Sequence, residues 1–261
     1  MSLLTRKTTT TVKNDDQFYS TGKYVVLQAE NTRFRLPSEI LTRKSQFFAD
    51  MFTLPVPASS ETAEGASDEK PIMLPASISA ESFRSLLKML YSSATFFGTS
   101  IEGVPVVLDK SEWISVLKLS TMWYFLECRK TVILKLTDVL GPIEKVCLGR
   151  EQNVAFWIQE GYKALVERAE TITDDEALSL KKNSGVDYAV TGLALLRIRE
   201  KKALKGTRHD LHFIARLIEQ EFSEELRTTM EAEKVYGIVK DLEPIDEVWP
   251  AKVPKDLFSD W

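Results

Sequence analysis

The side chains that most often carry chemistry in proteins are scarce in this chain. Its 261 residues include two cysteines, Cys128 and Cys147, and two histidines, His209 and His212. The histidines lie three residues apart, which would place two ring nitrogens on one face of a helix, but a structural zinc ion needs four ligands. We therefore expect no catalytic, cofactor-binding or metal-binding residues, and we expect that the protein is not an enzyme.

The short motifs that hold phosphate or a nucleophile are also missing. None of the 11 glycines falls in GxGxxG or GxxxxGK[ST], and GxSxG does not occur. Thr173, two aspartates and Glu176 form instead the pattern of a capping box at a helix start. Both cysteines lie in predicted amphipathic helices with no histidine close in sequence. We expect buried, unreactive thiols at both positions.

Composition and charge narrow the class of protein further. The chain is 44% hydrophobic and 28% charged, with a formal net charge of −4. This is an ordinary globular balance, and it argues against a protein that coats nucleic acid. No uncharged apolar run approaches about 18 residues, and the polar amino terminus lacks the apolar stretch of a secretory signal. With two free thiols, these features predict a cytoplasmic and/or nuclear protein without a membrane span.

One cluster of basic residues precedes an acidic stretch. The cluster consists of Arg197, Arg199, Lys201, Lys202, Lys205 and Arg208, with Glu200 as its single acid. The region 219–247 then holds ten acidic residues. Opposite charges on neighbouring helices favour surface complementarity, and phosphate binding by the basic patch is the alternative interpretation.

The amino-terminal half shows both strand and helix patterns. Residues 24–29 and 33–36 predict a hairpin, and a helix after Pro37 carries one apolar stripe through Phe52. Residues 55–70 form a flexible loop by composition, and 72–74 a short strand. Ser79 is a helix N-cap, with Ile78 and Phe83 placed for a hydrophobic staple. Two further helices are expected between residues 111 and 140.

After Pro142 the strand patterns disappear. Asn153 is expected to cap one helix, and residues 208–234 have the pattern of one long amphipathic helix. We therefore divide the chain into a disordered polar tail (1–14), a mixed α+β domain (15–140), a helical extension (141–242) and an extended tail (243–261).

The order of these elements resembles the BTB/POZ domain. The resemblance rests on YVVLQA (24–29), TRFRLPSEILTRKSQFFADMF (32–52), KPIMLPASISAESFRSLLKMLY (70–91) and EWISVLKLSTMWYFLECRKTVILKL (112–136). It is closest to the fungal BTB proteins with a helical C-terminal extension, to which Ile143–Glu151 and Ala164–Arg168 are similar. The resemblance implies an α+β fold in which helices cap a small mixed sheet, followed by an all-helical extension.

The resemblance also implies a function without catalysis. BTB domains are protein–protein interaction modules that oligomerise, join cullin-based ubiquitin ligases as adaptors, or assemble transcriptional regulators. Protein partners are therefore expected, with a cullin scaffold and a homodimer among the candidates. The main alternative is a transcription or chromatin-associated regulator whose basic patch contacts nucleic acid.

The resemblance further suggests which residues take part in such interactions. Tyr24 and Ser38 align with a charged pair that lies near the dimer pocket of many BTB domains. The interaction candidates are Phe18, Tyr19, Tyr24, Ser38, Met51, Phe52, Tyr91, Met122 and Tyr124.

Overall fold

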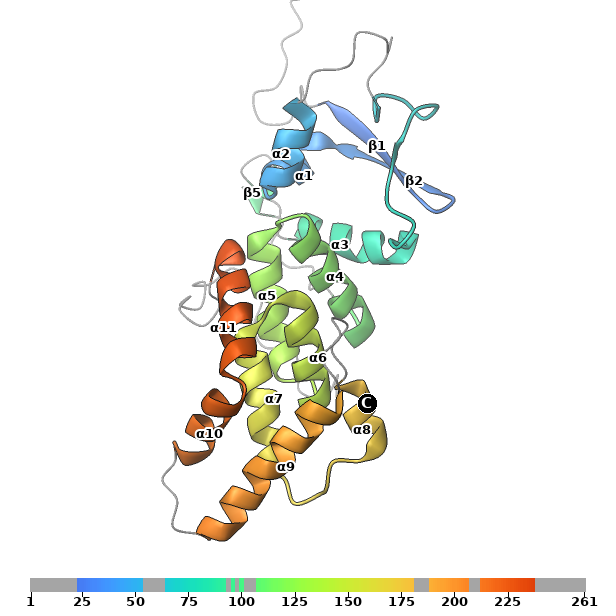
Figure 1. Cartoon of the computed structure of the whole chain (residues 1–261). Coiled ribbons are helices and arrows are strands. Elements are labelled where there is room, and N and C mark those ends of the chain that lie inside the picture. The colour runs from blue at the N-terminus through green and yellow to red at the C-terminus, as the bar shows by residue number, and fades with distance from the viewer. Residues whose placement is uncertain are drawn as a thin grey trace, which may run out of the picture.

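The computed structural model describes residues 23–53, 64–92, 95–96, 99–100, 107–180, 188–206 and 212–237. A small sheet with its helices forms the amino-terminal part, and helices alone form the rest (Figure 1). The elements are β1 (Tyr24–Ala29), β2 (Thr32–Pro37), α1 (Ser38–Thr42), α2 (Gln46–Thr53), β3 (Ile72–Met73), α3 (Ala80–Ser92), β4 (Thr95–Phe96), β5 (Thr99–Ser100), α4 (Lys110–Met122), α5 (Leu126–Thr137), α6 (Pro142–Gln152), α7 (Ala155–Glu167), α8 (Asp174–Ser179), α9 (Tyr188–Lys205), α10 (Phe213–Glu221), α11 (Ser223–Glu233) and the 3-10 helix η1 (Lys234–Tyr236). The predicted α+β class, with helices alone in the carboxyl-terminal part, is confirmed.

The main sheet has three strands in the order β2-β1-β3. Strands β1 and β2 form an antiparallel hairpin, in which Val25 lies opposite Leu36 and Leu27 opposite Phe34. Strand β3 runs parallel to β1, with Ile72 opposite Leu27. The apolar side chains of β1 are buried because this strand lies in the centre of the sheet. The predicted hairpin and third strand are confirmed.

The single helix expected after Pro37 is in fact two helices. The chain leaves the first at Arg43 and starts the second at Gln46, so α1 and α2 meet at a corner. The Ser45 hydroxyl at this corner accepts a hydrogen bond from the Phe48 amide at 3.2 Å and donates one to the Trp123 carbonyl at 2.6 Å. A partner that is 78 residues away therefore fixes this break, and the apolar stripe alone did not reveal it.

Two helix starts follow the sequence pattern directly. The Ser79 hydroxyl accepts a hydrogen bond from the Ser82 amide at 3.1 Å. Thr173 accepts one from the Glu176 amide at 3.3 Å, and the Glu176 carboxylate accepts one from the Thr173 amide at 3.0 Å. Both predicted caps are confirmed, because capping depends on neighbours within one helical turn.

Two other helix ends in the carboxyl-terminal part differ from the expectation. Asn153 does not start α7; it ends α6 in the left-handed conformation, with φ 52°. The long helix expected over 208–234 is interrupted at Phe222, which separates α10 from α11. Phe222 is buried, and its ring stacks on Tyr162 of α7 with the centroids 4.0 Å apart. Residues 207–211, the start of the expected helix, lie outside the described residues.

The first core connects the amino-terminal part with the helices behind it. Phe48 lies at its centre, with ring centroids 5.3 Å from Trp123 and 5.7 Å from Phe125. The same cluster of buried side chains continues to Val154 and Trp157 at the start of α7. The boundary that we expected at residue 140 therefore crosses a continuous apolar core.

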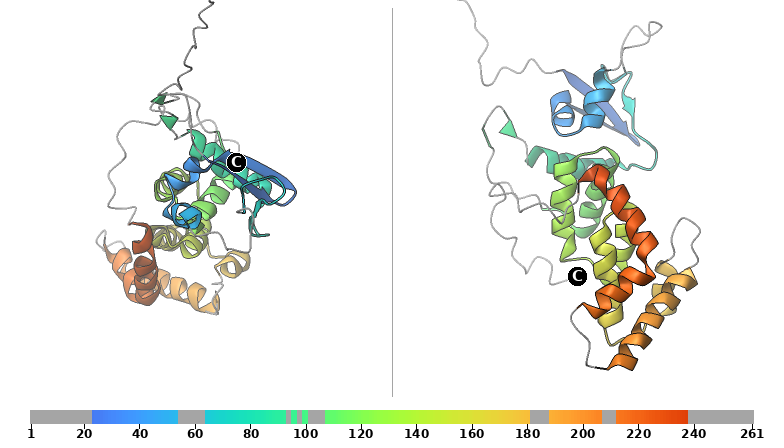
Figure 2. Two further views of the ribbon diagram at one scale, coloured as in Figure 1. Left: turned by 90° about the horizontal axis from the view of Figure 1, so that it is seen from above. Right: turned by 60° about the vertical axis from the view of Figure 1, so that its left-hand side comes forward.

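Close packing of α6 on α7 requires two glycines. A Cβ atom at Gly149 would lie 2.8 Å from Ile158 Cγ1, and one at Gly161 would lie 2.7 Å from the Pro142 carbonyl oxygen. These distances are shorter than ordinary van der Waals contact. The two helices run side by side through the middle of the molecule, and α9, α10 and α11 pack against α7 (Figure 2).

A buried ion pair contacts a second core, which is formed by buried side chains of α6, α7, α9, α10 and α11 and includes Ile158, Tyr162 and Leu195. The Arg150 side chain is 8% exposed, and its Nε donates to Glu225 Oε1 at 2.7 Å. The same guanidinium donates to the Tyr162 hydroxyl at 2.7 Å and to the Leu180 carbonyl oxygen. The Tyr162 hydroxyl donates in turn to Glu225 Oε2 at 2.7 Å. One cluster thus connects α6, α7, the end of α8 and α11.

Replacing Glu225 should therefore destabilise the protein far more than replacing its neighbour. Glu225→Ala leaves the Arg150 charge buried without its partner, which lowers the free energy of unfolding by about 3–5 kcal/mol. Glu224→Ala is the matched control, because Glu224 lies in the same helical turn with its side chain 79% exposed. Its loss should change stability by less than about 1 kcal/mol. Urea unfolding followed by circular dichroism measures both variants, and equal shifts of their midpoints would contradict the role of Arg150.

Candidate protein-interaction surface

At the corner where α4 meets α5, successive side chains point in turn toward solvent and toward the core. Trp123 and Phe125 are buried, whereas Met122, Tyr124 and Leu126 are 47%, 39% and 40% exposed. Tyr124 has a positive φ of 54°, a conformation that a residue with a side chain rarely adopts. This turn places three large apolar side chains close together on the surface, where they are available to a partner.

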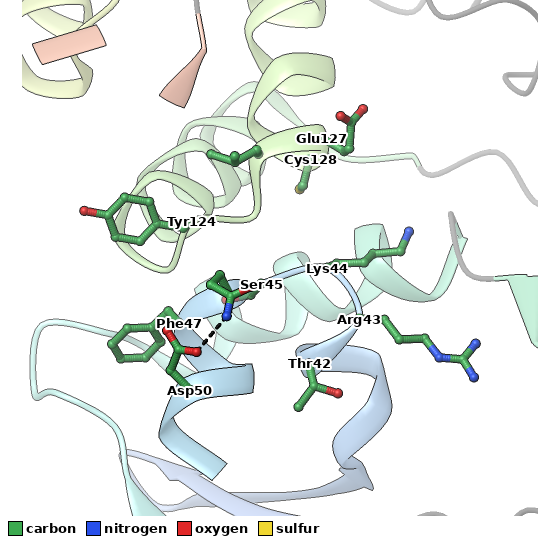
Figure 3. A pocket seen from close by; sticks show the side chains of 11 residues that line it. Thr42, Arg43, Lys44, Ser45, Phe47, Asp50, Tyr124, Glu127 and Cys128 are labelled. Atoms are coloured by element: carbon green, nitrogen blue, oxygen red, sulfur yellow. Dashed lines mark hydrogen bonds between the residues drawn. The ribbon is translucent and has the colours of Figure 1, made fainter. Parts of the chain in front are cut away.

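The corner between α1 and α2 faces this turn across a groove of about 680 Å³ (Figure 3). We call it the corner groove. Residues 42–47 and Asp50 form one wall, and Tyr124, Leu126, Glu127 and Cys128 form the other. The Ser45–Trp123 hydrogen bond joins the two walls, so the core fixes their separation.

The groove combines apolar and charged side chains. Phe47 on one wall is 41% exposed, and it lies at the same end of the groove as Tyr124 on the opposite wall (Figure 3). Arg43 and Lys44 extend from the first wall toward the other end. Burial lowers the pKa of Lys44, while Cys128 and Glu127 act in the opposite direction. Gln46 Nε2 donates to Asp50 Oδ1 at 2.6 Å, which orders the Asp50 carboxylate.

The carboxyl-terminal helices reach the rim of this groove. Tyr236 in η1 stacks on Tyr124 with ring centroids 5.5 Å apart and an interplanar angle of 21°. The Arg129 guanidinium lies 4.5 Å from the centroid of the Tyr236 ring. Just before η1, Glu233 accepts a hydrogen bond from the Ala155 amide at the start of α7, at 3.2 Å. These contacts join residues 78 to 112 positions apart, so no local pattern predicted them.

A second exposed cluster lies where β1 begins and α3 ends. Tyr24 is 58% exposed, and the Arg35 guanidinium lies 5.6 Å from the centroid of its ring. Tyr91 is 39% exposed, and its pKa is raised first by burial and then by Tyr24. The structure therefore brings together two of the tyrosines that the sequence suggested.

The other interaction candidates are less accessible. Ser38 is partly buried at the start of α1, and its amide donates to the Lys23 carbonyl at 2.8 Å. Met51 and Phe52 are partly buried and pack against the first core. Phe18 and Tyr19 lie outside the described residues. Phe47 and Leu126 were missed, because their positions in an apolar helical pattern indicated core.

The basic patch makes extensive contacts within the protein. Arg199 donates to the carbonyl oxygens of Leu165 and Glu170 at 3.0 and 2.8 Å, at the end of α7. Lys202 donates to Val166 at 3.4 Å, and Arg197 pairs with Glu221.

Two further members of the patch differ in their environment. Lys205 Nζ lies 4.1 Å from the centroid of the Phe213 ring, whereas Lys201 is exposed. Arg208 lies outside the described residues. Much of this positive charge thus neutralises a helix end and a neighbouring acid.

The described residues offer little for catalysis. Within the ranges that the structure describes, no three His, Cys, Asp or Glu side chains come together as metal ligands. His212 is exposed before α10, and His209 lies outside the described residues. Cys128 is buried as expected, whereas Cys147 is only partly buried and donates to the Ser179 carbonyl at 3.0 Å.

Comparison with protein families adds to this geometry. A sequence model of the BTB/POZ domain family matches residues 18–121. These residues form a BTB/POZ domain. No curated protein matches the chain. In the described part of the chain, no helix is long and apolar enough to cross a membrane.

The matched residues can be located in the structure. The match ends at Thr121, close to the end of α4, so the corner between α1 and α2 lies inside the match and the corner between α4 and α5 lies just beyond its end. A BTB/POZ domain implies a protein-interaction module, in keeping with exposed apolar side chains around a groove.

The buried thiol in the groove wall allows a test by pH. Burial raises the pKa of Cys128 to about 12, with Lys44 lowering it less. At pH 8 only about one thiol in ten thousand is then ionised, so iodoacetamide should leave Cys128 unmodified in the folded protein. At higher pH the rate at which Cys128 reacts should rise about tenfold for each pH unit, because the ionised fraction rises by that factor. Peptide mass spectrometry separates it from Cys147, and Cys128 reacting as fast as Cys147 would argue against this burial.

Proposed function

We propose that the protein is a non-catalytic adaptor that binds a partner protein at the corner groove of its BTB/POZ domain. The observation that carries the proposal is the set of exposed apolar side chains on a rigid support. Phe47, Tyr124 and Leu126 line the groove while Phe48 and Trp123 fix its walls from below. Interfaces gain most of their affinity from a few such anchors in preformed pockets.

The helical extension would give the adaptor a second function. Its core is distinct from the first, and its helices α9 and α10 lie far from the sheet (Figure 1). A chain that binds one protein at the BTB/POZ domain and another at the extension can link the two. We propose a cullin scaffold of a ubiquitin ligase as the partner of the BTB/POZ domain and a substrate as the partner of the extension.

Two leucines of α5 allow a matched test of the groove. Leu126 lines the groove at 40% exposure, and Leu134 lies on the same helix at 49% exposure outside the groove. Leu126→Asp should weaken binding to a purified cullin amino-terminal domain at least about tenfold, since a charge replaces an apolar anchor. Leu134→Asp should change it less than about twofold. Isothermal titration calorimetry measures both affinities.

The results separate the cullin from other partners. If the parent protein does not bind the cullin, the ubiquitin-ligase part of the proposal is wrong. Partners purified from an extract and identified by mass spectrometry then test the adaptor itself. Their equal recovery with Leu126→Asp and Leu134→Asp would rule out the groove as the binding site.

The second candidate is a transcription or chromatin-associated regulator that contacts nucleic acid through the basic patch. Exposed Lys201 on α9 favours it, whereas the internal contacts of Arg199 and Lys202 favour the adaptor. If the patch binds phosphate, replacing Lys201, Lys202 and Lys205 by Glu should weaken duplex DNA binding and flatten its salt dependence. Fluorescence anisotropy at several salt concentrations measures the DNA affinity of both proteins. Equal affinity of the parent and the variant would eliminate this candidate.

We place the adaptor in the cytoplasm or nucleus, which the free thiols Cys128 and Cys147 support. Homodimerisation through the BTB/POZ domain and the similarity to the fungal BTB proteins stay predictions. Multi-angle light scattering of the full chain tests the first of these.

A further inference from the structure

The last described residues of the chain lie against the corner groove. Tyr236 stacks on Tyr124, which lines the groove, and Gly237 follows directly. Gly237 has a φ of 76°, which glycine adopts without strain, so the chain can turn away from the axis of η1 here. Another 24 residues, 238–261, follow this point in the sequence.

We propose that residues 238–249 bind in the corner groove of the same molecule, where they compete with the partner protein. The inference rests on the proposed function for its regulatory meaning, because a segment in the groove limits access to it. Docking of the segment can nevertheless be measured without any partner.

The apolar side chains of this segment match those of the groove. Between residues 241 and 249, large apolar side chains alternate irregularly with acids. The apolar residues are Leu242, Ile245, Val248 and Trp249, and the acids are Asp241, Glu243, Asp246 and Glu247. The groove offers Phe47, Tyr124 and Leu126 to the first set. Its two cations, Arg43 and Lys44, are offset by the carboxylates of Asp50 and Glu127, so the apolar contacts carry the match. Tryptophan is one of the residue types enriched among interface anchors, which favours Trp249 as the residue that enters the groove.

The attachment point makes binding within one molecule favourable. Twelve residues can span at most about 40 Å when extended, and their starting point already touches the groove wall. A tether of this length produces an effective concentration in the millimolar range. Even a weak fit between the segment and the groove would then keep it bound, while a partner of higher affinity could displace it.

Hydrogen–deuterium exchange of the full chain tests this docking directly. Amides of residues 238–249 should exchange at least about tenfold more slowly than those of a synthetic peptide with the same sequence. Leu126→Asp should remove this protection, because it replaces an apolar contact by a negative charge that faces the acidic segment. The protein should still fold, since Asp is favourable in the first turn of α5. Leu134→Asp is the control and should retain the protection.

A second pair of variants tests the segment itself. Trp249→Ala should lose the protection, whereas Trp261→Ala, farther along the same tail, should keep it. Fast exchange in the parent protein, or protection that Leu126→Asp does not change, would overturn the proposal. Protection that falls on hundredfold dilution would show that a second copy supplies the segment, which would also overturn it.

Partner binding distinguishes this inference from the proposed function. If the segment competes, Trp249→Ala should increase the affinity for a groove-binding partner at least about threefold, with Trp261→Ala unchanged. A partner that binds the parent and Trp249→Ala equally, yet is lost with Leu126→Asp, would leave the adaptor function intact and overturn the competition. If no partner binds any variant while residues 238–249 stay protected, the docking stands and the adaptor function fails.

Discussion

A buried arginine determines how the BTB/POZ domain and the helical extension fit together. Arg129 of α5 is 1% exposed, and burial lowers its pKa, with Glu233 and Tyr236 acting against this effect. A charge in this position is tolerated only when its hydrogen bonds are satisfied. Its Nη2 donates to the carbonyl oxygens of Gln152 and Asn153 at 2.6 and 3.1 Å, where α6 ends.

The same arginine sets the position of other elements around it. Its Nε donates to Thr121 of α4 at 3.2 Å, and its guanidinium lies against Tyr236. The left-handed turn at Asn153 is one result, because this turn exposes carbonyl oxygens to Arg129. The position of η1 beside the groove is a second result of the contacts that Arg129 makes. The extension is therefore attached to the domain by contacts that continue from the core to the corner groove.

Local patterns were sufficient to predict much of the fold. The hairpin and the caps at Ser79 and Thr173 depend on neighbours in the sequence, and each is found where it was expected. The breaks at Ser45 and Phe222 were not predicted, because Trp123 and Tyr162, which decide them, lie 60 or more residues away. Amphipathic periodicity continues across such breaks, and a tertiary contact interrupts the helix all the same.

The proposed binding surface also combines features that local patterns indicate with features that distant contacts decide. Tyr124 was suggested by a resemblance of sequence, but its partner across the groove, Phe47, had the spacing of a core residue. Met122, Tyr124 and Leu126 form an alternating pattern around the buried Trp123 and Phe125, and this was the available sign that the helix ends there. The contact with Tyr236 had no such sign, since it depends on Arg129 and on the path of the whole extension.

The backbone at Tyr124 gives this tyrosine a further meaning. A positive φ favours glycine or asparagine, and a tyrosine there costs about 1 kcal/mol or more of folding free energy. Glycine would relieve this strain and remove the ring at the same time. With tyrosine at this position the turn is less stable than it would be with glycine, and an aromatic side chain lines the groove. Glu30 has a similar φ of 50° in the turn between β1 and β2, so Tyr124 differs through its place at the proposed binding groove, where stability and binding would oppose each other.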